Sequence, residues 1–198
     1  MKMLRVLLLA LIPFTAIAQD QVSSYERMKN FGIVYGAQWT LYILTQKPTI
    51  EDHGSFDHWI HYPSSPHFDN DSFDYNIFRH SLVGASYFLF YRSQGYQKVD
   101  AFLWSIISSA AFEFTIETVT ERPSWQDLYQ TPVYGTLLGL GLETVSDKFT
   151  ETNTWWGKTL GVITNPFRLL KKDDEKKEAL YPIYSPGKFG VAWTKEFE

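Results

Sequence analysis

Polar residues recur at every fourth position in three otherwise apolar stretches of this sequence, and that spacing constrains the fold more than any other feature. The three lines of residues are Asn76, His80 and Gly84; Ser109, Glu113 and Glu117; and Asp127, Thr131, Gly135 and Gly139. Residues four apart share one face of an α-helix. Each stretch is therefore predicted to be a helix with one polar stripe, and the stripes must face either one another or water.

Apolar and small residues at helical spacing predict five helices. We expect them over Ser24–Thr45, Asp74–Arg92, Val99–Thr120, Ser124–Phe149 and Trp155–Leu170. Pro132 is expected to bend the fourth helix, and Asn165-Pro166 to interrupt the fifth. Lys47–Ser72 is predicted to be a long irregular loop. The predicted fold is an all-α bundle of about five helices over residues 19–170, followed by a charged linker and tail over residues 171–198 with one possible strand.

The first 18 residues have the pattern of a cleaved signal peptide. Lys2 and Arg5 precede an apolar run, and Ala16-Ile17-Ala18 is the small-x-small sequence that signal peptidase cuts. The apolar run is much shorter than the roughly 20 residues of a membrane-spanning helix. The sequence therefore predicts an exported protein that begins at Gln19, with an uncleaved anchor as the alternative.

Composition excludes several classes of function. Lys+Arg 18 and Asp+Glu 22 give a formal net charge of −4, so no basic surface indicates nucleic-acid binding. The absence of cysteine excludes disulfides, thiolate metal sites and cysteine nucleophiles. The identity of any cofactor cannot be read from the sequence.

Two features favour a membrane-associated or membrane-embedded bundle. Small residues recur four apart, as in Gly32/Gly36 and Gly135/Gly139, and such pairs allow close helix packing in membranes. Many Trp and Tyr residues lie near the predicted helix ends, where a membrane interface would place them. Against conventional insertion, Glu113 and Glu117 lie in the most apolar helix, and a carboxylate near the bilayer centre costs about 2.5 to 3.5 kcal/mol. A soluble aromatic-rich bundle is the alternative.

If the three polar stripes converge, His80, Glu113, Glu117 and Asp127 form a buried cluster. Two carboxyl groups in a medium of low dielectric constant repel each other, so one of them would keep a proton. Such a cluster is typical of a general acid/base pair or of a hard metal site. An internal hydrogen-bond network and plain exposed carboxylates are the alternatives.

Other polar groups have local explanations. Ser124-x-x-Asp127 is typical of a capping box at a helix start, and Thr131-Pro132 of a second helix start. Gly84, Gly135 and Gly139 each cost about 1 kcal/mol of helix stability relative to alanine, which predicts that a backbone or ligand comes close to them. A further group of residues has the spacing of a zinc site but is expected to lie on a surface loop: Asp57, His58, His61 and His67.

The stretch from Asp71 to Phe167 resembles the uncharacterised bacterial envelope family called domain of unknown function 3943. The matching residues are Asn76, His80, Gly84, Arg92, Gly95, Glu113, Glu117, Pro123, Ser124, Asp127, Leu128, Thr131, Pro132, Gly135, Gly139, Asn165 and Pro166. The resemblance implies a secreted, outer-membrane-associated protein, and longer members continue into strand-rich regions. Where that pattern leads us to expect an acid, this chain has Leu140, with Glu143 three residues later. The order of the polar residues is also loosely similar to VanZ-like membrane proteins.

Two classes of function follow. The first is a membrane-associated protein of the bacterial periplasm or outer membrane with a structural or lipid-binding role, whose partner is a membrane lipid or another envelope component. The second is a hydrolase or transferase acting on envelope lipid or glycan, with Glu113 and Glu117 as the acid/base pair or metal ligands, His80 as a second proton carrier and Asp127 orienting it. Four further residues are expected to contribute to binding: Asn76, Arg92, Ser124 and Thr131.

Overall fold

The computed structural model describes residues 22–69, 72–171, 178–185 and 188–195. The predicted signal peptide and most of the predicted charged linker lie outside these ranges. Between Ser24 and Leu170 the described residues are helical wherever they form regular structure, apart from one isolated bridge between His67 and Ser124. Seven α-helices are present in this part of the chain, more than the five expected, so the all-α class is confirmed there and the number of helices is corrected.

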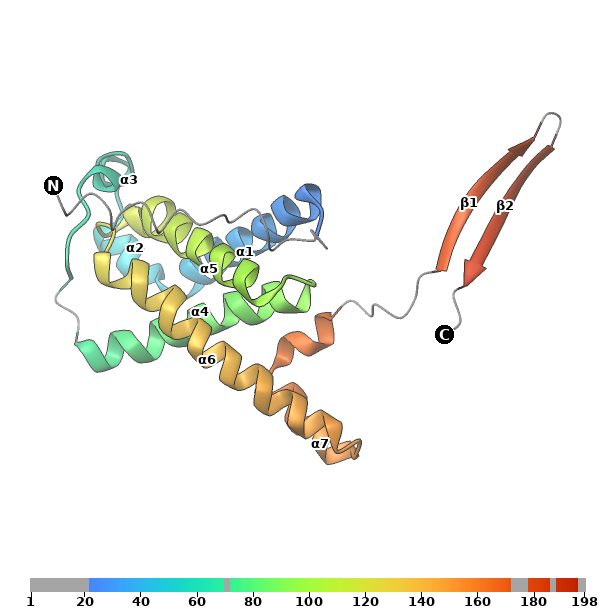
Figure 1. Ribbon diagram of the computed structural model, residues 1–198. Coiled ribbons are helices and arrows are strands. Elements are labelled where there is room, and N and C mark those ends of the chain that lie inside the picture. Colours follow the sequence, from blue (N-terminus) through green and yellow to red (C-terminus); the bar gives the residue numbers. More distant parts are fainter. Residues whose placement is uncertain (1–21, 70–71, 172–177, 186–187, 196–198) are drawn as a thin grey trace, which may run out of the picture.

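The long helices follow the predicted segments closely (Figure 1). They are α1 (Ser24–Thr45), α4 (Phe73–Ser93), α5 (Lys98–Ala111), α6 (Trp125–Glu151) and α7 (Trp155–Thr164). A 3₁₀ turn over Pro166–Leu170 follows α7, as the expected interruption at Asn165-Pro166 requires. Pro132 lies inside α6, which continues through it.

Two short helices replace the predicted irregular loop. They are α2 (Lys47–His53) and α3 (Phe56–His61), and a 3₁₀ turn over Tyr62–Ser64 follows. Pro48 lies in the first turn of α2, where proline is tolerated because its missing N–H has no helical partner there. Ser55 caps α3 by accepting a hydrogen bond from the backbone of Asp57 at 3.1 Å. These local caps allow helices too short to show a clear apolar period.

The third predicted helix changes its winding before it ends. After α5, the chain forms a π turn over Phe112–Ile116 and a 3₁₀ turn over Glu117–Val119. This part of the sequence is rich in β-branched residues, which are poor formers of regular α-helix. The first of the two expected glutamates therefore lies in a widened turn and the second in a tightened one.

Helices α4 and α6 cross with their backbones in contact (Figure 1). A Cβ atom placed on Gly84 would overlap the carbonyl oxygen of Thr131, and one placed on Gly135 would overlap the backbone of Gly84. A Cβ on Gly139 would lie 2.7 Å from the ring of Phe88. The prediction that these three glycines mark a close approach is confirmed.

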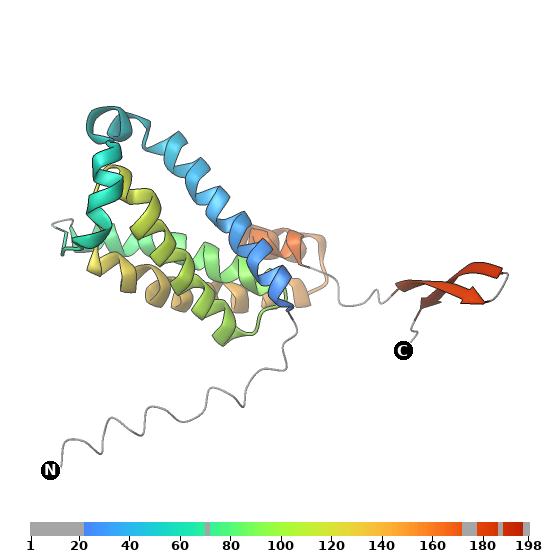
Figure 2. The ribbon, with the colours of Figure 1, turned by 90° about the horizontal axis from the view of Figure 1, so that it is seen from above.

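Helix α1 packs differently (Figure 2). It runs beside α5, with α2 and α3 at one end of the bundle, and Ser55 N donates to Val119 O at 3.0 Å to attach α3 there. Cβ atoms placed on Gly32 and Gly36 would have nothing within 4 Å. The expectation that this glycine pair mediates close helix packing is therefore wrong among the described residues.

The core lies where α4 meets α1, α5 and the turn after α4. Its buried residues are Val22, Val34, Phe88, Leu89, Phe90, Tyr91, Tyr96 and Ala101. The ring centroids of Tyr91 and Tyr96 lie 5.1 Å apart, and the ring of Trp104 packs against both. Four of the eight buried core residues are thus aromatic: Phe88, Phe90, Tyr91 and Tyr96.

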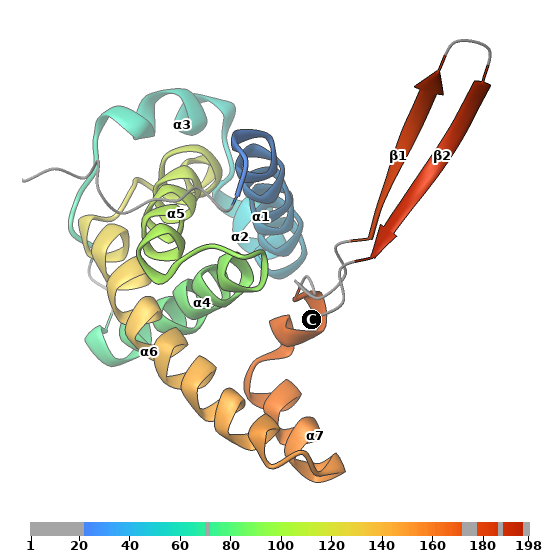
Figure 3. The ribbon, with the colours of Figure 1, turned by 45° about the vertical axis from the view of Figure 1, so that its right-hand side comes forward.

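The described part of the tail forms an antiparallel hairpin. β1 (Glu178–Ser185) pairs with β2 (Lys188–Lys195), and Ser185 lies opposite Lys188. The sequence predicted one strand here. The hairpin is drawn apart from the helices in Figures 1 and 3, while α7 folds back along the end of α6.

One helical stretch among the described residues is long and apolar enough to cross a membrane. It is Lys98–Val119, with a mean hydropathy of 1.4. The core helix of a soluble protein passes the same test, and this stretch carries two glutamates that face the interior of the bundle.

Candidate functional site

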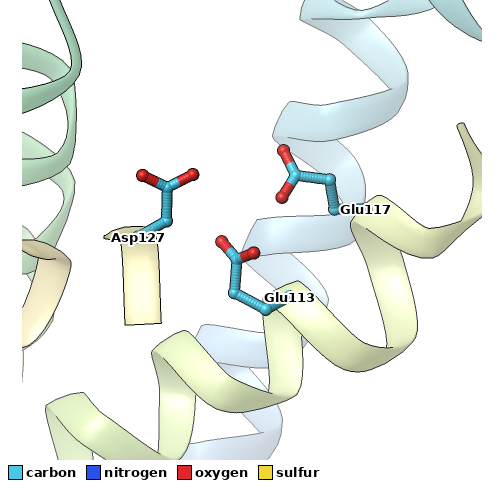
Figure 4. Close-up of side chains that lie close together, drawn as sticks. All are labelled: Glu113, Glu117 and Asp127. Atoms are coloured by element: carbon cyan, nitrogen blue, oxygen red, sulfur yellow. The ribbon is translucent and has the colours of Figure 1, made fainter. Parts of the chain in front are cut away.

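Three carboxylates converge at the end of α5 and the beginning of α6 (Figure 4). Glu113 comes from the π turn, Glu117 from the 3₁₀ turn that follows, and Asp127 from the first turn of α6. One carboxylate oxygen of each lies within 4.8 Å of the others. We call these three residues the acid cluster. The predicted convergence of the polar stripes is therefore present.

Burial makes ionisation of this cluster costly. Glu113 is 2% exposed and Asp127 is 7% exposed, whereas Glu117 is half-buried. The alternative of plain exposed carboxylates is wrong for the first two. Burial, and then the neighbouring charge of Glu117, raise the pKa of Glu113 well above its ordinary value.

The pKa of Glu117 is also raised above its ordinary value. Burial is the main cause that raises its pKa to about 8, and the charges of Glu121 and Asp127 act in the same direction. A hydrogen bond with Glu113 and the charge of Arg79 act in the opposite direction. The two glutamates thus form a hydrogen-bonded carboxyl pair that shares a proton.

Ser124 ties the acid cluster to the start of α6. Its backbone N–H donates to Glu113 Oε2 at 3.0 Å, and its hydroxyl accepts from the backbone N–H of Asp127 at 3.3 Å. The same hydroxyl donates to the carboxylate of Asp69, which comes from the segment after α3. The predicted cap at Ser124 is confirmed, and it serves the cluster as well as the helix.

His80 joins the cluster from α4. Its Nε2 lies 3.2 Å from Asp127 Oδ1, and its Nδ1 is 2.9 Å from the hydroxyl of Thr131. Thr131 lies inside the continuous helix α6, so its predicted role as the cap of a new helix is wrong. Its hydroxyl instead fixes the orientation of the imidazole ring, so that His80 Nε2 faces the carboxylate of Asp127.

A cavity of about 600 Å³ opens beside the acid cluster. Glu113, Glu117 and Asp127 all line it, and α1, α4 and the turns after α5 form much of its wall. Along α4, the lining residues are Arg79, His80, Val83, Ser86, Tyr87 and Phe90. Because a helix rises about 1.5 Å per residue, the charged side chains at one end of this wall are separated along the cavity from Phe90 at the other.

One of the expected binding residues, Arg92, is not part of this site. Arg92 lies at the other end of α4, where its Nε donates to Glu143 Oε1 at 2.8 Å and its Nη1 to the carbonyl of Tyr96 at 2.5 Å. Glu143, the acid displaced from the expected position, therefore has a structural partner. Asn76 lies in α4, and its side chain is outside the described part of the structure.

The loop histidines do not gather into a metal site. His58 stacks on Tyr62 with ring centroids 4.2 Å apart, and His61 pairs with Asp57 at 3.2 Å. His67 instead joins the segment before α6, with its backbone N–H donating to Pro123 O at 2.9 Å. Within the described ranges, only the acid cluster brings three potential ligand atoms of His, Asp or Glu together. The zinc-like interpretation of this segment is wrong there.

Sequence reasoning missed several cavity residues, Gln38 and Tyr87 among them. Gln38 Nε2 donates to the hydroxyl of Tyr87 at 2.8 Å and to Ser108 O at 2.9 Å. A signal for the first was present, because Asn30, Val34, Gln38 and Tyr42 are four apart and all buried on α1. Two residues of this stripe, Asn30 and Gln38, carry amide side chains, which taken one at a time are typical of a protein surface.

Comparisons with known proteins give one match. A family model described as a domain of unknown function (DUF3943) matches residues 65–167. Neither a curated protein nor a solved structure matches the chain. The looser similarity to VanZ-like membrane proteins has no support in these comparisons and stays a prediction.

Proposed function

This chain belongs to the family called domain of unknown function 3943, and from that premise we propose that it is an exported protein of the bacterial cell envelope. In this proposal the protein lies against a membrane and binds an amphiphilic molecule in the cavity beside the acid cluster. The family carries no stated activity, so the proposal depends on the geometry of this chain. Export is supported by the sequence of residues 1–18.

The cavity is the observation that carries the proposal. Its volume of about 600 Å³ is in the range of small-molecule sites. Its apolar lining residues are Ile33, Val34, Leu41, Val83, Phe90, Phe112, Phe167 and Leu170. Buried carboxyl groups meet that apolar lining on one wall. A cavity with both an apolar and a polar part suits an amphiphilic ligand, which has an apolar part and a polar part of its own.

Exposed apolar side chains support a position against a membrane. On α6, the large exposed residues Trp125, Tyr129, Val133, Leu137 and Val145 follow a spacing of four or eight. On α7, Trp155 is 80% exposed and Ile163 is 71% exposed. Figure 3 shows α7 and the C-terminal end of α6 extending away from the rest of the bundle. Helices that present Trp and aliphatic side chains in this way suit a membrane interface.

A cavity-filling variant tests ligand binding. N-phenyl-1-naphthylamine is a neutral probe whose fluorescence rises in apolar surroundings, and we expect the purified protein to bind it. Val83→Trp should reduce this binding at least tenfold, because Val83 lines the cavity. Leu82→Trp is the matched control, since Leu82 is also 44% exposed on α4 but does not line the cavity. Equal loss in both variants would contradict cavity binding.

Export and membrane attachment have separate tests. Mass spectrometry of the protein from its native cells is expected to give a mature chain that starts at Gln19. On cell fractionation the protein is expected to sediment with membranes, and Leu137→Glu together with Ile163→Glu should release part of it. Complete release of the unmodified protein with the soluble periplasm would contradict the membrane position.

A second candidate function is acid–base catalysis on the bound molecule by a hydrolase or transferase. Two observations favour it: the hydrogen-bonded pair of Glu113 and Glu117, and the imidazole of His80 held 3.2 Å from Asp127. A carboxyl that keeps its proton near neutral pH can act as a general acid. Glu117→Gln should then abolish turnover of envelope lipid extracts while probe binding persists. Turnover that survives this substitution would contradict the enzyme.

A further inference from the structure

The polar part of the cavity wall is rich in hydrogen-bond acceptors. The acid cluster places three carboxylate oxygens within 4.8 Å of one another. Glu113 accepts a backbone hydrogen bond from Ser124 N at 3.0 Å. Each carboxylate oxygen can accept more than one hydrogen bond. The cluster therefore has acceptor capacity toward the cavity.

Gln38 adds an independent acceptor from α1. Its side chain lines the same cavity, and the residue is only 5% exposed. Because its Nε2 donates to Tyr87 and to the carbonyl of Ser108, the amide is fixed with its oxygen on the opposite side. That oxygen, Oε1, is buried and has no hydrogen-bond partner among the described residues. Buried polar atoms are normally satisfied, so this atom indicates a donor supplied by a ligand.

Charge points to the sign of that ligand. The acidic residues that line the cavity are Asp69, Glu113, Glu117, Glu121 and Asp127, and the lining arginines are Arg79 and Arg122. Carboxyl groups thus outnumber guanidinium groups. A ligand that brings an anionic group to this wall would add another like charge, whereas a cation would relieve the repulsion between the buried carboxylates.

We propose that the cavity binds a long-chain primary amine, with its ammonium group at the acid cluster and its apolar chain running along α4 toward Phe90. An ammonium group has three N–H donors. These donors can be divided between Gln38 Oε1 and the oxygens of the acid cluster, which all lie within 4.8 Å of one another. This inference rests on the proposed function, because it specifies the ligand of the same cavity.

A divalent metal ion is the main competitor, and the cavity argues against it. Oxygen-rich sites of this kind do bind hard cations. A metal ion alone, however, leaves the apolar lining at Val83 and Phe90 without a partner. An alkylammonium ion occupies both parts of the cavity at once.

Displacement of N-phenyl-1-naphthylamine at pH 7 tests the proposal with three ligands that share one chain length: octylamine, octanol and octanoate. We expect octylamine to displace the probe at a concentration at least tenfold below that of octanol, and octanoate to be the weakest. Equal displacement by the amine and the alcohol would overturn the amine and leave cavity binding intact. A protein that binds neither the probe nor any of the three ligands would overturn the proposed function itself.

Substitutions place the preference at the cluster. Glu117→Gln keeps the size of the side chain and should reduce the advantage of octylamine over octanol about tenfold, with octanol unchanged. Glu51→Gln, on an exposed residue paired with Lys47 outside the cavity lining, is the matched control and should keep the advantage. Circular dichroism verifies that both variants are folded. If octylamine keeps its advantage over octanol in Glu117→Gln, the ammonium group does not bind at the acid cluster and the proposal is overturned. A rise in melting temperature with Ca²⁺ or Mg²⁺ that exceeds the rise with octylamine would overturn it as well.

Discussion

On its side toward α6, helix α4 meets another backbone directly, whereas on its side toward α1 the same helix lines a cavity of about 600 Å³. Glycine makes the first contact possible, because Gly84 and Gly135 leave no side chain between the helices. On the second side, α1 reaches α4 through hydrogen-bonded side chains such as Gln38 and Tyr87. The difference teaches that one tight helix crossing can hold polar groups in place while the opposite side stays open to a ligand.

The largest effect is expected on the closed side. Gly84→Ala would place a methyl group on the carbonyl oxygen of Thr131, so the two helices would have to separate. We expect the free energy of unfolding to fall by about 3 kcal/mol or more, as measured by urea denaturation. A loss below about 1 kcal/mol would show that the crossing is looser than described here, since overpacking of a rigid contact costs at least that much.

The next effect concerns the open side and its buried carboxyl groups. The folded chain holds a proton on Glu117 up to about pH 8, whereas the unfolded chain releases it near the ordinary pKa of 4.5. Unfolding between these values releases a proton, so stability should fall as pH rises from about 4.5 to about 8 and then level off. The slope is at most about 1.4 kcal/mol per pH unit for one group.

Denaturation curves at several pH values measure this slope. Glu117→Gln should flatten the slope, because the amide does not titrate, and Glu51→Gln should leave it as it is. Stability that instead rises over this interval would mean that the glutamates are ionised and paired in the folded protein.

A smaller effect is expected where the two sides meet. Ser124→Ala removes the cap of α6 and the hydrogen bond to Asp69. Loss of a helix cap typically costs about 1 kcal/mol, so we expect a loss of about 1 to 2 kcal/mol. Ser23→Ala, which removes the exposed cap of α1 at Glu26 N, is the control and should cost less. Chemical denaturation of both variants provides the comparison.

The smallest effect has the opposite sign. Gly36→Ala adds a methyl group on α1 where nothing lies within 4 Å. Alanine is preferred to glycine inside a helix by up to about 1 kcal/mol, so this variant should be slightly more stable than the parent. A loss of stability would indicate that a partner or lipid normally contacts this face, and repeating the melt in detergent would separate those cases.

The sequence was sufficient to predict the polar stripes themselves, because helical periodicity is a local property. The spacing of Glu113 and Glu117 on one stretch, and the position of His80 on another, could be read without knowing how the helices pack. The small residues at Gly84 and Gly135 then indicated that these helices touch. Elements with a strong period and long length were accordingly predicted best.

Other parts of the site depend on contacts between distant segments. Asp69 reaches Ser124 across 55 positions, and no periodicity relates the two residues. Gln38 contributes through Tyr87 of another helix, and its own stripe combines apolar and amide side chains. Helix α3 is held by its cap at Ser55 and by contacts with the turns after α5. Such contacts leave no period in the sequence, so a composition rich in Pro, Gly and Ser suggested an irregular loop.

The hydrogen bond from Ser124 N to Glu113 spans only 11 positions, and it has a consequence for how this chain can diverge. The intervening connection contains the exposed residues Glu121 and Arg122, so substitutions there are expected to leave the fold intact. The length of this connection, in contrast, is expected to be constrained. One added or deleted residue would rotate the first turn of α6 relative to the widened turn and separate Asp127 from both glutamates, so insertions in related chains are expected to occur elsewhere, such as at the turn between α6 and α7.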